Sequence, residues 1–266
     1  MAARSLPNGS AAGLPLTVVR QDRTLGAAED LDFALGLLAA AKRGDVGPTL
    51  RIYRPQPTVA LGQRDARLPG FDDAVRACRA QGFEPLVRKA GGRAAAYHRG
   101  CLILDHVEPE TNAVAGSRAR FAAFGDMYVS ALRRAGADAA VGEIPGEYCP
   151  GEFSVHGATP GGAKIKLVGT AQRVVSGAWL FSSVFVVQDA APLRRVLEGC
   201  YAALGLDWNP ETAGAAEDTG AADLKSVEAA LVDAYAARGP LEFGDFETLA
   251  QSLHSAAAAS GATSVQ

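Results

Sequence analysis

Hydrophobic positions recur at helical spacing in several stretches of the chain, most clearly where Leu31, Leu35 and Leu38 stand three or four residues apart and Gly44 follows. This spacing places apolar side chains on one face of a helix, and glycine is common just past a helix end. The pattern predicts helices at residues 27–44, 71–82, 119–136, 191–205 and 223–239.

Shorter runs rich in β-branched and other apolar residues lie between the predicted helices and indicate strands. The runs at 49–54 and 58–63 are joined by a proline-containing turn and could pair with each other. Ser176–Gly177 turns the strand at 163–175 into the strand at 178–187, which predicts a hairpin. The other predicted strands are residues 14–20, 85–98 and 101–107, the last two on either side of a glycine-rich turn.

These strands and helices cluster without regular alternation along the chain. The fold class that we expect is therefore α+β, with a mixed or antiparallel sheet flanked by helices and a small C-terminal helical part. The expected division is one main domain at 14–205 and a C-terminal helical segment at 206–254. Polar, low-complexity sequence at 1–13 and 255–266 predicts disordered tails.

The composition is that of an ordinary globular protein and gives no support for a nucleic-acid-binding or membrane function. Hydrophobic residues make up 48% and charged residues 21% of the 266 positions, as in ordinary globular proteins. A net charge of -3 gives no electrostatic reason to expect nucleic acid or a membrane as a partner. The chain has neither a run of about 20 apolar residues nor a secretory signal, so we expect a cytoplasmic protein.

The cysteines are scattered without a Cys-x-x-Cys pair, which favours reduced thiols over a disulfide framework. Cys78, Cys101 and Cys200 fall within predicted helices and strands, where buried structural cysteines are common. The histidines also lack metal-ligand spacing, so we expect no metal site.

A glycine pair with basic neighbours occurs in the sequence Arg88-Lys89-Ala90-Gly91-Gly92-Arg93. Adjacent glycines can adopt positive φ and let the backbone approach a ligand closely. Backbone N–H groups, Arg88 and Arg93 could then hold a phosphate, a carboxylate or an acyl carbonyl. The alternative is an ordinary β-turn with solvated arginines.

Cys149 lies in a loop between Tyr148 and Pro150-Gly151, which is not a usual place for a core cysteine. A loop thiol acts as a nucleophile where a nearby cation or helix N-terminus favours its thiolate. The alternative is an inert exposed thiol.

Two lysines occur in the otherwise apolar strand at 163–175. Lys164 and Lys166 are two residues apart and share one face of the strand. If that face borders a pocket, either ammonium could polarise a carbonyl or favour the thiolate of Cys149. The alternative is an edge strand protected by charged residues.

Taken in order, these segments resemble the biotin/lipoate A/B protein ligase superfamily, whose members carry an R-x-x-G-G element followed later by a K-x-x-G strand. The matching residues are Arg88 to Gly92 and Lys166 to Gly169. The resemblance extends over residues 14–239. The Tyr-Cys-Pro-Gly loop around Cys149 looks most like that of the octanoyl-[H protein]:protein N-octanoyltransferases, also called lipoyl amidotransferases.

The resemblance implies that residues 14–205 form a catalytic domain like that of biotin and lipoate protein ligases. It further implies an acyltransferase of protein lipoylation, which moves an octanoyl or lipoyl group through a cysteine thioester to a lysine of a lipoyl domain. The donor would be an H protein or an acyl carrier protein, with no cofactor required. The implied catalytic residues are Cys149 and Lys166, and the implied substrate-binding residues are Arg88, Gly91, Gly92, Lys164, Gly169 and Thr170.

Two alternative functions stay open. An ATP-dependent lipoate-protein ligase would bind an acyl-adenylate at the glycine pair and Lys166, would need ATP and Mg²⁺, and would leave Cys149 without a role. A non-catalytic relative would bind an acyl group or its carrier without turnover. The strand at 100–106 departs from the family's usual G-x-L-N-x-S pattern and keeps this second alternative open.

Overall fold

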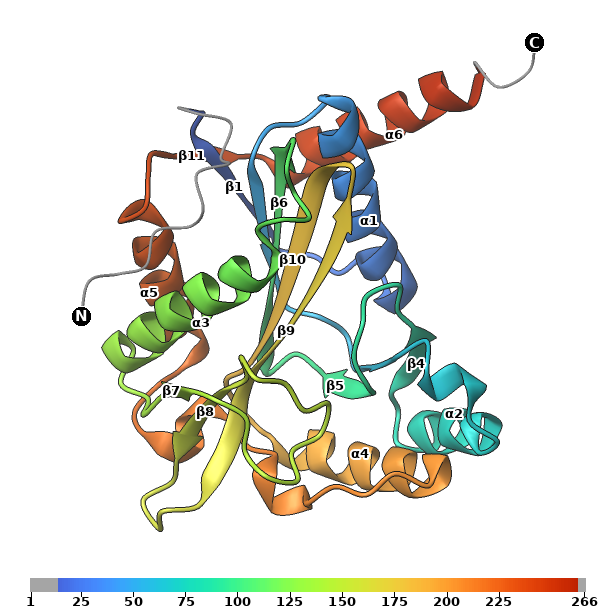
Figure 1. Ribbon diagram of the computed structural model, residues 1–266, viewed down its shortest axis with the longest axis vertical. Coiled ribbons are helices and arrows are strands. Elements are labelled where there is room, and N and C mark those ends of the chain that lie inside the picture. Colours follow the sequence, from blue (N-terminus) through green and yellow to red (C-terminus); the bar gives the residue numbers. More distant parts are fainter. Residues whose placement is uncertain (1–13, 263–266) are drawn as a thin grey trace.

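The computed structural model describes residues 14–262, and the predicted tail at 1–13 lies outside the described residues. An eight-stranded sheet runs through the molecule (Figure 1). In order across this large sheet, the strands are β11 (Leu241–Gly244), β1 (Leu16–Gln21), β2 (Thr49–Tyr53), β6 (Cys101–Glu110), β10 (Gly177–Val186), β9 (Lys164–Val175), β8 (Val155–Ala158) and β7 (Ala140–Val141).

The large sheet is mixed, so the predicted α+β fold class is confirmed. Strand β1 pairs in parallel with β11 and β2. The remaining neighbours, from β2 to β7, pair antiparallel. The predicted hairpin is present, because β9 and β10 run antiparallel on either side of a turn at Ser176.

A second, three-stranded sheet shows that one predicted pairing was wrong. Its order is β4 (Glu84–Val87), β3 (Thr58–Leu61) and β5 (Ala95–Tyr97). Strand β3 therefore does not pair with β2, which is bonded to β1 and β6 in the large sheet. The connection between them contains Pro55 and Pro57, and proline lacks a backbone donor and has a fixed φ. This turn carries the chain from one sheet to the other.

The five predicted helices are present, and a sixth, α6, follows them in the described chain. As predicted, α1 and α4 end at glycines in the left-handed conformation, Gly44 with φ 83° and Gly205 with φ 65°. None of the described helices is long and apolar enough to cross a membrane. The helices are α1 (Ala27–Arg43), α2 (Phe71–Ala80), α3 (Ser117–Arg134), α4 (Ala191–Leu204), α5 (Leu224–Ala236) and α6 (Phe246–Ala262), with short 3₁₀ turns η1 (Asp65–Arg67), η2 (Pro210–Thr212) and η3 (Ala216–Thr219).

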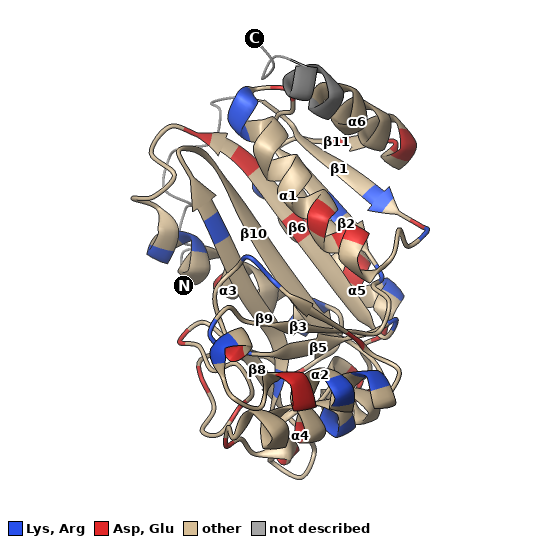
Figure 2. Ribbon diagram, turned by 90° about the vertical axis from the view of Figure 1, so that its right-hand side faces the viewer, with Lys and Arg blue, Asp and Glu red and all other residues tan. Residues whose placement is uncertain are grey.

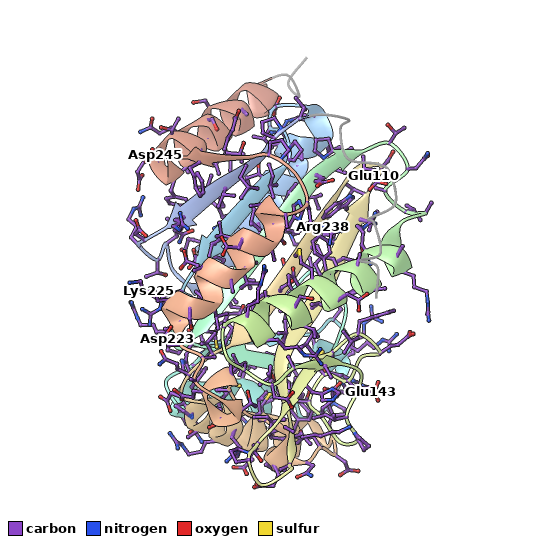
Figure 3. All side chains as sticks on the ribbon, turned by 90° about the vertical axis from the view of Figure 1, so that its left-hand side faces the viewer. Glu110, Glu143, Asp223, Lys225, Arg238 and Asp245 are labelled. Atoms are coloured by element: carbon purple, nitrogen blue, oxygen red, sulfur yellow. The ribbon has the colours of Figure 1, made fainter. Side chains whose placement is uncertain are left out.

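Alternation along the central strands separates two faces of the large sheet. On β6, Leu102 and Leu104 join the core that α3 and α5 cover, whereas Ile103 joins the core beneath the small sheet, α2 and α4. On β10, Phe181 packs on the first face and Leu180 packs under α1 on the other. Figure 3 shows α3 and α5 lying over their face, and Figure 2 looks onto the opposite face, beside α1 and the small sheet.

The C-terminal segment is packed into this architecture. Strand β11 extends the large sheet beyond β1, and Tyr235 of α5 belongs to the core on the α3 face. Helix α6 continues to Ala262, within the range predicted as a tail. The division of the chain at residue 205 stays a prediction.

Candidate active site

A cavity of about 780 Å³ lies on the α1 face of the large sheet, bordered by α1, the small sheet and the loop at 147–154. This volume is in the usual range of small-molecule sites. The cavity brings together all but one of the predicted site residues: Arg88, Gly91, Gly92, Cys149, Lys166, Gly169 and Thr170. Lys164 does not line it.

The loop at 147–154, here called the cysteine loop, holds Cys149 in an uncommon backbone conformation. The φ of Cys149 is 43°, in the left-handed region that non-glycine residues seldom adopt. Its N–H donates to the Tyr201 hydroxyl at 2.8 Å, and its carbonyl accepts from Lys166 Nζ at 2.8 Å. Tyr201 in turn donates to the Ala94 carbonyl at 2.9 Å. The fold thus holds both peptide groups of Cys149, which stabilises the conformation against its strain.

The thiol of Cys149 faces the turn at 88–93, here called the glycine turn. Its Sγ accepts from the Arg93 backbone N–H at 3.3 Å and from the Arg88 guanidinium at 3.5 Å. Gly92 lies between these groups with φ 102°, and a Cβ at this position would stand 2.8 Å from the sulfur. Only glycine fits there, because any side chain would collide with Cys149 and adopt an unfavourable φ.

A hydrogen bond within the glycine turn and an ion pair to Asp65 hold the turn in place. Arg88 Nη2 donates to the Arg93 carbonyl at 2.9 Å. Arg93 also forms an ion pair at 3.0 Å with Asp65, whose carboxylate is fully buried and accepts from the Gly62 N–H at 2.8 Å. The buried Arg88 Nε has no hydrogen-bond partner among the described residues. The turn therefore places the Arg88 guanidinium and the Arg93 N–H beside the thiol.

Lys166 approaches the cysteine loop from β9 and is only 2% exposed. Besides the Cys149 carbonyl, its Nζ donates to the Tyr148 carbonyl at 3.0 Å and lies 3.5 Å from Glu147 Oε2. The other oxygen of Glu147 accepts from the Gly151 N–H and the Ser154 hydroxyl. Burial lowers the pKa of Lys166 and raises the pKa of Glu147, while each charge favours the ionised form of the other.

Lys164, two residues earlier on the same strand, is exposed. It stands at the start of β9, opposite Ala158 of β8, near the tip of the hairpin that these two strands form. Sharing a face with Lys166 does not bury it, because burial depends on what covers that face. The structure gives no contact between Lys164 and the other predicted residues.

Three residues of the site carry little signal in the sequence. Tyr201 is one of many apolar positions in α4, and Asp65 precedes no recognisable motif. Glu147, two residues before Cys149, is buried although its neighbours Pro150 and Glu152 in the same loop are exposed. Their roles depend on contacts between segments that are distant in the chain.

The other cysteines are reduced and buried, on α2, β6 and α4, in the kinds of element that the sequence predicted. Across residues 14–262, no group of three or more His, Cys, Asp or Glu residues is placed to hold a metal ion. The cysteine loop, the glycine turn and Lys166 meet at one place in the cavity wall.

This fold and site define an α+β protein with a thiol held inside a cavity of small-molecule size. The family model described as lipoyl protein ligase A/B catalytic domain matches residues 27–201, and the chain belongs to this family. The match begins with α1 and ends at Tyr201, so it contains the glycine turn, the cysteine loop and Lys166.

Curated relatives are similar to part of the chain. An octanoyl-[GcvH]:protein N-octanoyltransferase of Exiguobacterium sibiricum is 30% identical over 168 residues, which are 62% of this chain and 58% of that protein. A protein of the same name from Geobacillus kaustophilus is 30% identical over 60% of this chain and 55% of its own length. A lipoyl-[GcvH]:protein N-lipoyltransferase of Listeria monocytogenes is 32% identical over 40% of this chain and 38% of its own length. The matches thus span little more than half of the first two relatives.

Solved structures share the fold. The bipartite lipoate protein ligase of Thermoplasma acidophilum superposes with a TM-score of 0.63 at 21% identity, covering 87% of this chain and 86% of that chain. A lipoate-protein ligase A bound with ATP superposes with a TM-score of 0.64 at 19% identity, covering 88% of both chains. At these identities the likeness establishes the fold alone.

Proposed function

We propose that this chain transfers an octanoyl or lipoyl group, through a thioester on Cys149, to a lysine of a lipoyl domain. The observation that carries the proposal is the position of the Cys149 thiol, inside the cavity and against the Arg93 N–H and the Arg88 guanidinium. The names of the curated relatives support the acyl class and the transfer reaction.

In the first step, the sulfur of Cys149 attacks the acyl carbonyl of the donor. The S–C bond forms, the C–N bond to the carrier lysine breaks, and the proton of the thiol ends on the departing amine. Negative charge develops on the carbonyl oxygen, which stands next to the sulfur during attack. The Arg93 N–H and Arg88 already contact this sulfur, so they are suitably placed to stabilise that oxygen.

In the second step, the amine of the acceptor lysine attacks the thioester. A C–N bond forms, the C–S bond breaks, and the proton of the amine returns to Cys149. In both steps, Lys166 holds the cysteine loop by donating hydrogen bonds to the carbonyls of Tyr148 and Cys149. Its ammonium also adds positive charge beneath the loop. The reaction exchanges one amide for another, so it needs no ATP.

The wall of the cavity suits an acyl chain. Aliphatic side chains from α1, β4, β6 and β10 line it, among them Leu35, Leu86, Ile103 and Val184. Burying an eight-carbon chain contributes roughly 5 kcal/mol at about 0.8 kcal/mol per methylene. The donor in this scheme is an octanoylated or lipoylated H protein, whose acyl–lysine amide is the bond that breaks, and the acceptor is a lipoyl domain. From an acyl carrier protein the bond broken is instead a C–S bond, and the proton of the Cys149 thiol ends on the departing carrier thiol.

Intact-protein mass spectrometry tests the proposal. After incubation with an octanoylated H protein without ATP, we expect the mass of one octanoyl group on the protein, labile to hydroxylamine and mapped by peptide analysis to Cys149. Acyl transfer that requires ATP and Mg²⁺ would instead indicate a ligase. Carrier binding with neither adduct nor transfer would indicate a non-catalytic relative.

Removing the Tyr201 hydroxyl is expected to slow acylation without preventing it. Tyr201→Phe loses the hydrogen bonds to the Cys149 N–H and to the Ala94 carbonyl. One or two such bonds are worth about 1 kcal/mol each, so we expect kcat to fall roughly tenfold while KM changes little. Single-turnover acylation kinetics measure the effect.

Tyr235→Phe is the matched control, since it removes a tyrosine hydroxyl from the core on the α3 face. It should leave acylation unchanged. Equal rates for Tyr201→Phe and the unsubstituted protein would show that the hydroxyl does not position Cys149.

A further inference from the structure

Two tyrosines in the wall of the cavity have hydroxyl groups without partners. Tyr53 of β2 and Tyr97 of β5 both line the cavity and are only 4% and 5% exposed. Among the described residues, neither hydroxyl takes part in a hydrogen bond. Neither is among the polar atoms that are sealed from solvent without a partner, so both hydroxyls open onto the cavity. Burial raises the pKa of both phenols, so both remain neutral donors.

An acidic group lies in the same part of the cavity. Ser182 and Asp105 stand opposite each other on β10 and β6, and both line the cavity. The Ser182 hydroxyl donates to Asp105 Oδ1 at 2.6 Å, and Arg51 donates to Oδ2 at 3.1 Å. The Arg51 guanidinium also lies over the ring of Tyr53, 3.9 Å from the ring centroid, which places this tyrosine beside the pair.

These polar groups are separate from the reacting thiol. None of Tyr53, Asp105 and Ser182 forms a described hydrogen bond or ion pair with Cys149 or Lys166. Tyr97, on β5, lies in the wall of the same cavity. The acyl carbonyl binds beside the Cys149 sulfur, at the Arg93 N–H and Arg88, so groups elsewhere in the wall contact the chain of a bound acyl group.

A plain saturated chain suits the aliphatic part of the cavity wall but not these polar groups. It would displace water from the hydroxyls of Tyr53 and Tyr97 and give them no partner, which is unfavourable for buried polar groups. An oxygen or sulfur atom on the chain would accept from a phenol, and a hydroxyl could also donate to Asp105. Sulfur gains further from contact with the aromatic rings.

We infer that the cavity selects an acyl group that carries oxygen or sulfur along its chain over a plain octanoyl group. A lipoyl group and a hydroxylated octanoyl group share this chemistry. The inference rests on the proposed function for the acyl class alone, since it concerns binding and not transfer.

Calorimetry on the full chain with Cys149→Ala tests it with three ligands, the N-methylamides of octanoic, 8-hydroxyoctanoic and lipoic acid. We expect at least one of the two polar ligands to bind about five- to tenfold more tightly than the octanoyl amide, as one additional hydrogen bond would give. The ranking of the two polar ligands tells oxygen from sulfur. Octanoyl binding as tight as both, or tighter, overturns the inference.

Substitutions assign the preference to the tyrosines. In the same background, the double variant Tyr53→Phe with Tyr97→Phe should bind the three ligands within about twofold of one another, and it should bind the octanoyl amide at least as tightly as before, because no hydroxyl is left without a partner. Tyr128→Phe, which removes a hydroxyl bonded to Ser183 on the other face of the sheet, should keep the preference. A preference that survives in the double variant contradicts the inference. Because no turnover is measured, failure to form a thioester does not affect this result.

Discussion

Cys149→Ala is expected to abolish acyl transfer, lowering kcat by roughly 10³-fold or more, because the acyl group loses the sulfur that carries it between donor and acceptor. The two backbone contacts of residue 149, to Tyr201 and Lys166, do not involve the side chain. The cysteine loop should therefore keep its place, and the loss should be chemical. Transfer from an octanoylated H protein to a lipoyl domain, followed by mass spectrometry, measures it.

A second cysteine provides the control. Cys78 is buried on α2, away from the cavity wall, and Cys78→Ala should transfer acyl groups at a rate close to that of the unsubstituted protein. Normal transfer by Cys149→Ala would refute the thioester. If the transfer by Cys149→Ala required ATP, the ligase alternative would replace the transferase proposal.

Lys166→Met is expected to lower kcat by about 10²-fold, because the loop that carries the reacting sulfur loses the ammonium that holds it in place. The substitution removes the donors that hold the Tyr148 and Cys149 carbonyls. It also leaves the buried Glu147 carboxylate without its cation, so the free energy of unfolding should fall by about 3–5 kcal/mol. Steady-state kinetics and urea denaturation measure the two effects.

Lys164→Met is the matched control, because it removes the same charge from an exposed position on the same strand. It should change neither activity nor stability appreciably. The double variant Lys166→Met with Glu147→Gln removes both buried charges, so it should recover stability without recovering activity. Recovery of both would mean that Lys166 acts only by balancing Glu147.

The prediction of the fold succeeded where local pattern decides the structure. The spacing of Leu31, Leu35 and Leu38 and the stop at Gly44 predicted α1, and Ser176 marked the turn of the hairpin. Pairing between strands was harder. Strands β2 and β3 are neighbours in sequence and both are buried, yet they belong to different sheets. Periodicity shows which side chains are buried and does not show which strand lies beside another.

The C-terminal strand β11 also escaped prediction. It has only four residues, Leu241–Gly244, and most of them are exposed. It forms because β1 offers an edge to pair with, a condition that no local pattern records.

The sequence by itself determined most of the helices and strands, the fold class and the chemically unusual residues: a cysteine outside a helix or strand, a glycine pair among basic residues, and lysines in an apolar strand. These are local properties, set by residue type and spacing. The tertiary structure decided which of them meet. It buries Lys166 and exposes Lys164, joins Cys149 to Tyr201, and leaves two tyrosine hydroxyls open to the cavity. Such contacts link residues far apart in the chain, and their geometry is created only when the sheets and helices pack together.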